Sequence, residues 1–369
     1  MKNEWIYEKL DDVCSVDYGT RVVQKKDKGS KYYVYGGGGA TFMVDTYNRE
    51  DCFVVARFAM SPKCTRFVSG KFFLNDSGLS VSTKSTKLLQ SFVNKVLLAN
   101  NDTIYNMGKG MAQKNLDMPS FRNLDIPVPP LQEQERIVAE LDLLTGIIDK
   151  QKQQLKELDT LAQSIFYDMF GNPVENDKGW EKKQIGKICT SKKQIQRASK
   201  RFKDSDIIRY IDISSIDNIN NVMTSTTSYG FGDAPSRAQQ VVEIGDVLIS
   251  LVRPNLNNVA MVSEDGTDLV ASSGFCVLRA NCEIVKEFLF YSVKMKCFTD
   301  YLMQRVSGAN YPAVREDDIM GYNIILPPLE LQESFAQKIQ SIESQKQSIN
   351  RSLAESQKLF DYTMDKYFG

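Results

Sequence analysis

Two stretches of the chain, residues 131–171 and 329–369, carry apolar residues at alternating spacings of four and three. This heptad pattern predicts two long α-helices that pair along an apolar seam. Polar residues interrupt the seam, notably Gln151 in the first stretch and Lys346 in the second. At 1.5 Å per residue, each helix would be about 60 Å long. The predicted seam residues are Ile137, Leu141, Leu144, Ile148, Leu155, Leu158, Phe335, Ile339, Ile342, Ile349, Leu353 and Phe360.

These stretches belong to an internal repeat. The Pro-Pro-Leu sequence at 129–131 returns at 327–329, and both stretches close on Phe-Gly, with the same offset of 198 residues. A Trp-led segment at 5–14 returns at 180–189 with an offset of 175, so the second body is 23 residues longer than the first. The pattern predicts four parts, which are a body at 1–128, a helical spacer at 129–171, a second body at 172–326 and a second spacer at 327–369.

The Pro-Pro pairs mark the point where each body ends and each helix begins. Proline interrupts regular backbone hydrogen bonding and favours an extended residue before it. We therefore expect a short strand to stop at each pair, at residues 126–128 and 324–326, and a helix to follow.

An antiparallel pairing of the two helices matches their polar breaks better than a parallel one. It places Gln151 opposite Lys346 and small Ala162 opposite large Phe335, whereas the parallel register buries Gln151 against Ile349. The sequence therefore predicts an antiparallel coiled coil within one chain. The alternatives are helices that pack on separate bodies or that pair between chains.

The two bodies mix short β-rich runs with short helical stretches and turn signals, which is typical of α+β domains. The clearest β-rich runs are 32–35, 52–58, 207–213 and 247–252. The predicted fold class is therefore α+β, with two globular domains joined by two long helices in an antiparallel coiled coil and related by a pseudo-twofold repeat.

The composition limits the chemistry that this chain can perform. Its 369 residues contain no histidine, which excludes Ser-His-Asp and Cys-His catalysis and every zinc site that needs imidazole. The seven cysteines include no Cys-x-x-Cys pair, and reduced, buried thiols are the simplest interpretation. No apolar stretch is long enough to span a bilayer, and the N-terminus has no signal-peptide pattern. We expect a cytoplasmic protein. An enzyme stays possible only if carboxylates, lysines or a cofactor carry its chemistry.

The formal charge is zero, with 46 basic and 46 acidic residues, but the charge is segregated. The helical stretches are acidic, so the bodies carry a basic excess. Lysines and arginines cluster soon after the Trp-led segment in both copies, and this recurrence favours phosphate contacts over the alternative of a solvated face. The clustered residues are Lys25, Lys26, Lys28 and Lys31 in the first body, and Lys192, Lys193, Arg197, Lys200, Arg201 and Lys203 in the second.

A second group of candidates has side chains suited to base edges. Arg253, Asn255 and Asn257 follow a β-rich run, and Arg pairs with guanine while Asn pairs with adenine. Asparagines that cap a loop are the alternative. Further candidates for DNA contact lie near the ends of the bodies and could equally be merely exposed. They are Lys109, Lys114, Tyr311 and Arg315.

Several motifs together resemble the DNA-specificity (S) subunits of type I restriction-modification systems. They are Ile-Pro-Val-Pro-Pro-Leu-Gln-Glu-Gln-Glu-Arg-Ile at 126–137, Ile-Leu-Pro-Pro-Leu-Glu-Leu-Gln-Glu at 325–333, Tyr-Val-Tyr-Gly at 33–36, Gly-Asp-Val-Leu-Ile-Ser at 245–250 and Gly-Met-Ala-Gln-Lys-Asn-Leu at 110–116. The resemblance covers essentially the whole chain. Residues 308–311 depart from the first copy's form at 112–115.

The resemblance implies that each body is a target recognition domain for one half of a bipartite double-stranded DNA site, with the coiled coil setting the spacer. It also implies two methyltransferase subunits as partners and, in some systems, restriction subunits. Catalysis, S-adenosylmethionine, ATP and magnesium would then belong to those partners, and this chain would hold no catalytic residue, metal or cofactor. The competing hypotheses are a coiled-coil adaptor without DNA sequence readout, and an enzyme with divergent motifs.

Overall fold

The computed structural model describes residues 5–111, 113–190, 194–307 and 312–369. These residues form two compact units. Unit 1 comprises Met1–Gln153 and Asn350–Gly369, and unit 2 comprises Gln154–Ile349. Two 40-residue helices, α5 (Leu131–Phe170) and α10 (Leu329–Phe368), each contribute one part to each unit.

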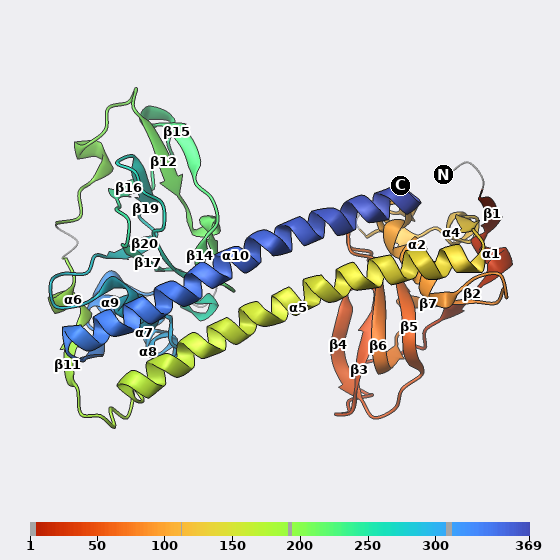
Figure 1. Ribbon diagram of the computed structural model, residues 1–369, viewed down its shortest axis with the longest axis horizontal. Helices are drawn as coiled ribbons and strands as arrows, with labels where there is room; N and C mark the ends of the chain where they lie inside the picture. The colour runs from red at the N-terminus through yellow and green to blue at the C-terminus, as the bar shows by residue number, and fades with distance from the viewer. Residues whose placement is uncertain (1–4, 112, 191–193, 308–311) are drawn as a thin grey trace. The chain divides into compact units, whose positions relative to one another are not determined.

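A six-stranded sheet forms most of the body of unit 1 (Figure 1). Its strands are antiparallel except for the parallel pair of β3 and β6. In spatial order the strands are β2 (Cys14–Tyr18), β7 (Gly78–Thr83), β5 (Arg49–Ala56), β6 (Thr65–Leu74), β3 (Tyr32–Gly36) and β4 (Gly39–Val44).

Helix α2 (Gln90–Ala99) joins this sheet to the helical part of unit 1. Its buried face includes Phe92 and Val96, which share one core cluster with Val55 of β5 and Ile137 of α5. Short elements close the remaining sides. They are α1 (Leu10–Val13), α3 (Asn101–Asn106), β8 (Gly108–Lys109), β9 (Asn115–Leu116) and α4 (Met118–Arg122).

Unit 2 contains a four-stranded sheet and a three-stranded sheet. The larger sheet has the order β15 (Thr227–Gly230), β12 (Ile207–Ile211), β19 (Leu269–Ser272) and β16 (Ala238–Val241). The smaller one has the order β18 (Val259–Met261), β17 (Val247–Ser250) and β20 (Phe275–Leu278). Around them lie β13 (Ile216–Asp217), β14 (Val222–Met223), α6 (Ile185–Ile188), α7 (Lys286–Lys294), α8 (Lys296–Met303) and α9 (Glu316–Met320).

A two-stranded antiparallel ribbon leads into each long helix. In unit 1, β1 (Ile6–Lys9) pairs with β10 (Asp125–Val128), and in unit 2, β11 (Glu181–Gln184) pairs with β21 (Asn323–Leu326). The strands expected before the two Pro-Pro pairs are therefore present, and each helix begins directly after its prolines, as predicted.

A buried glutamine explains why the Pro-Pro-Leu-x-x-Gln sequence recurs. The Gln134 amide donates to the carbonyls of Pro129 and Lys87, at 2.7 and 2.8 Å, and accepts from the Leu89 N–H at 2.8 Å. Gln332 in unit 2 is equally buried and has the same bonding pattern, to Pro327, Glu283 and Val285. Each glutamine therefore ties the first turn of a long helix to the start of the helix packed beside it.

In unit 1 the first part of α5 packs against the last part of α10 in an antiparallel arrangement. The Tyr367 hydroxyl donates to Glu140 Oε2 at 2.7 Å, and Arg136 donates to that hydroxyl at 3.1 Å. Further along the pair, Gln151 Nε2 donates to Ser352 Oγ at 2.8 Å. The predicted antiparallel pairing within one chain is therefore confirmed.

In unit 2 the last part of α5 packs against the first part of α10 in the same sense. Phe335 lies 5.6 Å from Phe166 and 5.3 Å from Phe170 between ring centroids, and Lys346 Nζ lies 3.0 Å from Asp159. The expected partners, Ala162 for Phe335 and Gln151 for Lys346, were wrong. The aromatic rings and the Lys–Asp attraction displace the register by about two helical turns from the one that polar matching favoured.

The predicted seam residues fall into two groups. Those near the bodies are buried, namely Ile137, Leu141, Leu144, Ile148, Phe335, Ile339 and Ile342. The other five are half-buried, namely Leu155, Leu158, Ile349, Leu353 and Phe360.

Candidate nucleic-acid interface

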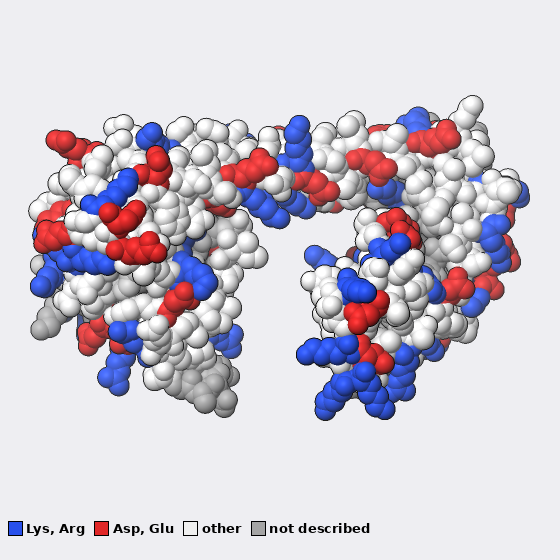
Figure 2. Space-filling model, turned by 90° about the horizontal axis from the view of Figure 1, so that it is seen from below, with Lys and Arg blue, Asp and Glu red and all other residues white. Residues whose placement is uncertain are grey.

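The first basic cluster, Lys25, Lys26, Lys28 and Lys31, lies on the connection between β2 and β3 of unit 1. All four side chains are exposed, and within the described part of the chain none of them makes an ion pair. Figure 2 shows Lys and Arg gathered on this unit at the end away from its helices. The four ammonium groups are therefore placed to contact a polyanion.

The second basic cluster lies before β12 of unit 2, where Arg197, Lys200, Arg201 and Lys203 are exposed. Their backbone is anchored by Ala198, which is fully buried against the four-stranded sheet. Lys192 and Lys193 of the same cluster lie outside the described residues.

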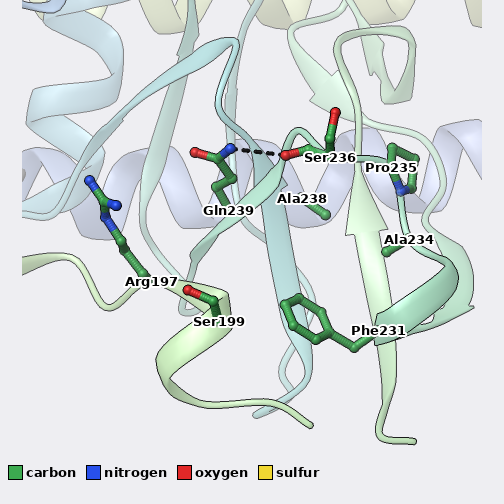
Figure 3. Close-up of a pocket in the computed structure, with 8 residues that line it drawn as sticks. All are labelled: Arg197, Ser199, Phe231, Ala234, Pro235, Ser236, Ala238 and Gln239. Carbon is green, nitrogen blue, oxygen red and sulfur yellow. Dashed lines mark hydrogen bonds between the residues drawn. The ribbon is translucent and has the colours of Figure 1, made fainter. Parts of the chain in front are cut away.

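A hollow of about 280 Å³ adjoins this second cluster. Arg197 and Ser199 form one side of the hollow, and Phe231 and Gln239 come from the segment that faces them (Figure 3). The Gln239 amide donates to the Ser236 carbonyl at 2.9 Å. A guanidinium, a hydroxyl and a ring face are groups that bind phosphates and stack on bases.

The three base-reading candidates of unit 2 lie on one turn but have different surroundings. Arg253 and Asn255 are exposed. In contrast, the Asn257 amide points into the protein, where it donates to the Lys294 carbonyl at 3.1 Å and accepts from Thr299 at 3.5 Å. The Asn257 side chain therefore joins the turn to α7 and α8, and Arg253 and Asn255 are the exposed members of the three.

The remaining candidates are also divided by the structure. Lys109 Nζ pairs with Asp117 at 2.9 Å. A hydrogen bond from Ser120, together with this Lys109 contact, lowers the pKa of the Asp117 carboxyl. Lys114 lies over the Tyr105 ring at 3.9 Å. Arg315 is exposed at the start of α9, where its N–H donates to Asp318, and Tyr311 lies outside the described residues.

Sequence reasoning missed a group of basic and aromatic residues on the loop after β5. The Arg57 guanidinium contacts two rings, at 4.6 Å from the centroid of Tyr18 and 4.3 Å from that of Phe58. Lys63 is exposed on the same loop, and Arg66 donates to the Lys63 carbonyl at 2.8 Å. In the sequence, the adjacent Arg57 and Phe58 were the available signal for a loop that contacts nucleic acid.

Within the described residues, no cluster of three or more His, Cys, Asp or Glu side chains could hold a metal ion. Burial raises the pKa of the Cys14 thiol to about 11 and that of Cys189 to about 12, so both are protonated at neutral pH. Among the helices in the described ranges, not one has a stretch apolar enough and long enough to traverse a bilayer.

The fold defines a protein with two similar α+β domains carried on paired helices. The family model of the type I restriction modification DNA specificity domain matches this chain twice, at residues 2–160 and 177–356. The chain belongs to this family.

Individual relatives agree with this assignment. The chain is 26% identical over 304 residues to the specificity subunit of the type I restriction enzyme MjaVIII from Methanocaldococcus jannaschii, which covers 75% of this chain and 70% of that one. It is 23% identical over 255 residues to the putative MjaX specificity subunit of the same organism, covering 64% of this chain and 56% of that one.

Solved structures show the same fold. The S subunit of a type I restriction-modification system from M. genitalium superposes with a TM-score of 0.62 at 14% identity, over 99% of this chain and 96% of that chain. A chain from a structure of complex assembly and conformational transition in the type I R-M system superposes with a TM-score of 0.50 at 19% identity, over 99% and 97% of the two chains.

Proposed function

We propose that this chain is the DNA-recognition subunit of a type I restriction-modification complex. Each unit recognises one half of a bipartite DNA site, and the paired helices fix the gap between the halves. The observation that carries the proposal is the double match of the specificity domain, at 2–160 and 177–356, with an exposed basic segment soon after the start of each copy.

The proposed protein partners are two methyltransferase subunits, with restriction subunits added in a complete system. Exposed leucines support binding of two copies of one partner, because they recur at equivalent positions of α5 and α10. Leu131 and Leu329 are 43% and 41% exposed, and Leu161 and Leu359 are 47% and 52% exposed. Two copies of the same apolar surface fit two copies of one partner.

In this proposal the chain supplies recognition and its partners supply the chemistry. S-adenosylmethionine, ATP and magnesium are assigned to the partner subunits, and no cofactor is assigned to this chain. Because its net charge is zero, we expect the isolated chain to bind DNA weakly and with a strong salt dependence.

The test is the methylome of a modification-free host that expresses this chain with the methyltransferase subunit of its own system. The expected result is one methylated motif with two half-sites around a fixed gap, which disappears when this chain is omitted. A soluble complex that methylates no motif in a manner dependent on this chain would favour a non-reading adaptor instead.

A further inference from the structure

Each unit contains a hairpin loop between two consecutive antiparallel strands, and the two loops have the same length. In unit 1 the Ala56 N–H donates to the Cys64 carbonyl at 2.8 Å and closes loop 57–63 between β5 and β6. In unit 2 the Ser250 N–H donates to the Asn258 carbonyl at 3.0 Å and closes loop 251–257 between β17 and β18.

The first residue of each loop makes the same backbone contact with a distant segment. The Leu116 N–H donates to the Arg57 carbonyl at 2.8 Å, and the Val314 N–H donates to the Leu251 carbonyl at 2.9 Å. Leu116 and Val314 are themselves equivalent, because both precede the short helix that leads to the Pro-Pro pair. The loops therefore occupy matching places in the two copies.

A second backbone bond holds each loop from its middle. The Met60 N–H donates to the Lys114 carbonyl at 2.9 Å, and the Arg253 N–H donates to the Pro312 carbonyl at 2.7 Å. Each loop is thus clamped by two bonds to the strand-like segment beside it. A loop clamped in this way presents its side chains in a fixed direction.

Both loops hold a residue other than glycine in the left-handed backbone region. The φ of Ala59 is +48° and that of Arg253 is +49°. This conformation costs free energy for residues with a Cβ and persists where the surrounding structure dictates it. Asn257 adds a second such residue in unit 2, with a φ of +50°, and its inward hydrogen bonds hold it there.

The two loops share this backbone conformation and these backbone hydrogen bonds, but their exposed side chains differ. Loop 57–63 exposes Phe58 and Lys63, and loop 251–257 exposes Arg253 and Asn255. Arg and Asn form bidentate contacts with guanine and adenine, and an apolar ring contacts the thymine methyl group. One backbone frame with two sets of contact residues is what recognition of two different half-sites requires.

We propose that loops 57–63 and 251–257 are the base-reading loops of units 1 and 2, each for one half-site. Arg253 and Asn255 determine bases in one half, and Phe58 and Lys63 determine bases in the other. This inference rests on the proposed DNA-recognition function. It assigns the discrimination of bases to these loops and leaves affinity for the phosphate backbone to the basic clusters.

The test is the methylome of the full chain in complex with its methyltransferase subunits. The variants are Arg253→Asn, because Asn tolerates the left-handed conformation, and Asn255→Ala. We expect each to relax at least one base position of a single half-site, with methylation of the formerly rejected sequence rising about tenfold or more. The gap and the other half-site should stay unchanged. Phe58→Ala with Lys63→Ala should relax the opposite half-site, and the exposed helix variant Lys358→Ala serves as the control.

Two results would overturn the assignment while wild-type methylation stays intact. One is a motif identical to that of the wild type in both Arg253→Asn and Asn255→Ala. The other is a uniform loss of methylation with all base preferences retained, because the loop would then contact only the phosphate backbone. If the wild-type chain itself directs no bipartite motif, the proposed function fails and the loop assignment falls with it.

Discussion

The Nζ atom of Lys346 in α10 lies 3.0 Å from Oδ1 of Asp159 in α5, and this contact joins the two long helices within unit 2. Glu343 also accepts from Lys346, at 3.1 Å, and the Tyr291 hydroxyl donates to Glu343 at 3.1 Å. Only 8% of the Lys346 side chain is exposed. Burial lowers the pKa of this ammonium, but Glu343 and Asp159 outweigh the effect and raise it overall. The repeat places Ile148 at the equivalent position of α5, so this charge cluster is specific to one unit.

The first prediction concerns this buried charge. Lys346→Met should destabilise unit 2 by about 2 kcal/mol, because Asp159 and Glu343 lose their main partner but remain partly solvated. Denaturant unfolding measures the change in the free energy of unfolding, and hydrogen exchange of the α7 amides locates it in unit 2. Since the folded pKa of Lys346 is raised, the difference between variant and wild type should be fully present at neutral pH and lost as the pH rises above about 10.5. The exposed Lys358→Met is the matched control. An equal loss of stability in that variant would show that the effect of Lys346→Met does not come from the contacts with Asp159 and Glu343.

The second prediction concerns the repeated buried glutamines. Gln134→Ala removes an acceptor for Leu89 N–H and a donor for the Lys87 and Pro129 carbonyls, and should cost about 3 kcal/mol. Hydrogen exchange should quicken in α2 of unit 1, while α7 of unit 2 keeps its protection. Gln132→Ala, at an exposed position two residues earlier, should change neither the free energy of unfolding nor the exchange in α2. Unchanged protection of α2 in Gln134→Ala would show that the glutamine does not join the two helices.

The sequence predicted those features that depend on local rules. The Pro-Pro pairs and the heptads located helix α5 at Leu131–Phe170 and helix α10 at Leu329–Phe368 nearly to the residue. The register of the pair was not predictable in the same way. The register depends on the contact of Phe335 with Phe166 and on the ion pair of Lys346 with Asp159. Both join residues that are far apart in sequence.

The candidate site was only partly predictable for a related reason. Asn257 has the residue type of a base-reading side chain, but its amide points inward and supports the loop. Loop 57–63 was missed because its equivalence with loop 251–257 lies in backbone hydrogen bonds and not in shared residues. Charge clusters, by contrast, are visible in the sequence because long basic side chains rarely lie inside a core, and the described members of both clusters are exposed.

The third prediction concerns the cysteines. Burial raises the thiol pKa of Cys14 to about 11, against an opposing effect of Lys84, and that of Cys189 to about 12. At pH 8 a thiol reagent should therefore label the exposed Cys282 quickly, and Cys14 and Cys189 only after unfolding. Peptide mass spectrometry identifies the labelled residues. Fast labelling of Cys189 in the folded chain would contradict the expectation.

The same shifts predict a dependence of stability on pH. The unfolded thiols ionise near pH 9, whereas the folded ones hold their protons to about pH 11 and 12. The folded state therefore binds more protons in this interval, and the free energy of unfolding should fall as the pH rises from 9 to 12. The double variant Cys14→Ala with Cys189→Ala should show a smaller fall. An identical slope in the variant and the wild type would assign the fall to other groups.

The last prediction concerns Gln151, the polar break in the heptads of α5. Its Nε2 donates to Ser352, but its Oε1 is buried and has no hydrogen-bond partner among the described residues. A buried acceptor without a donor costs free energy, so Gln151→Leu should raise the free energy of unfolding by about 1 kcal/mol. Gln154→Leu, at an exposed position of the same helix, should give no gain. If Gln151→Leu destabilises the chain, then the bond to Ser352 contributes more than the unpaired oxygen costs, and the polar break stabilises this register of the helix pair.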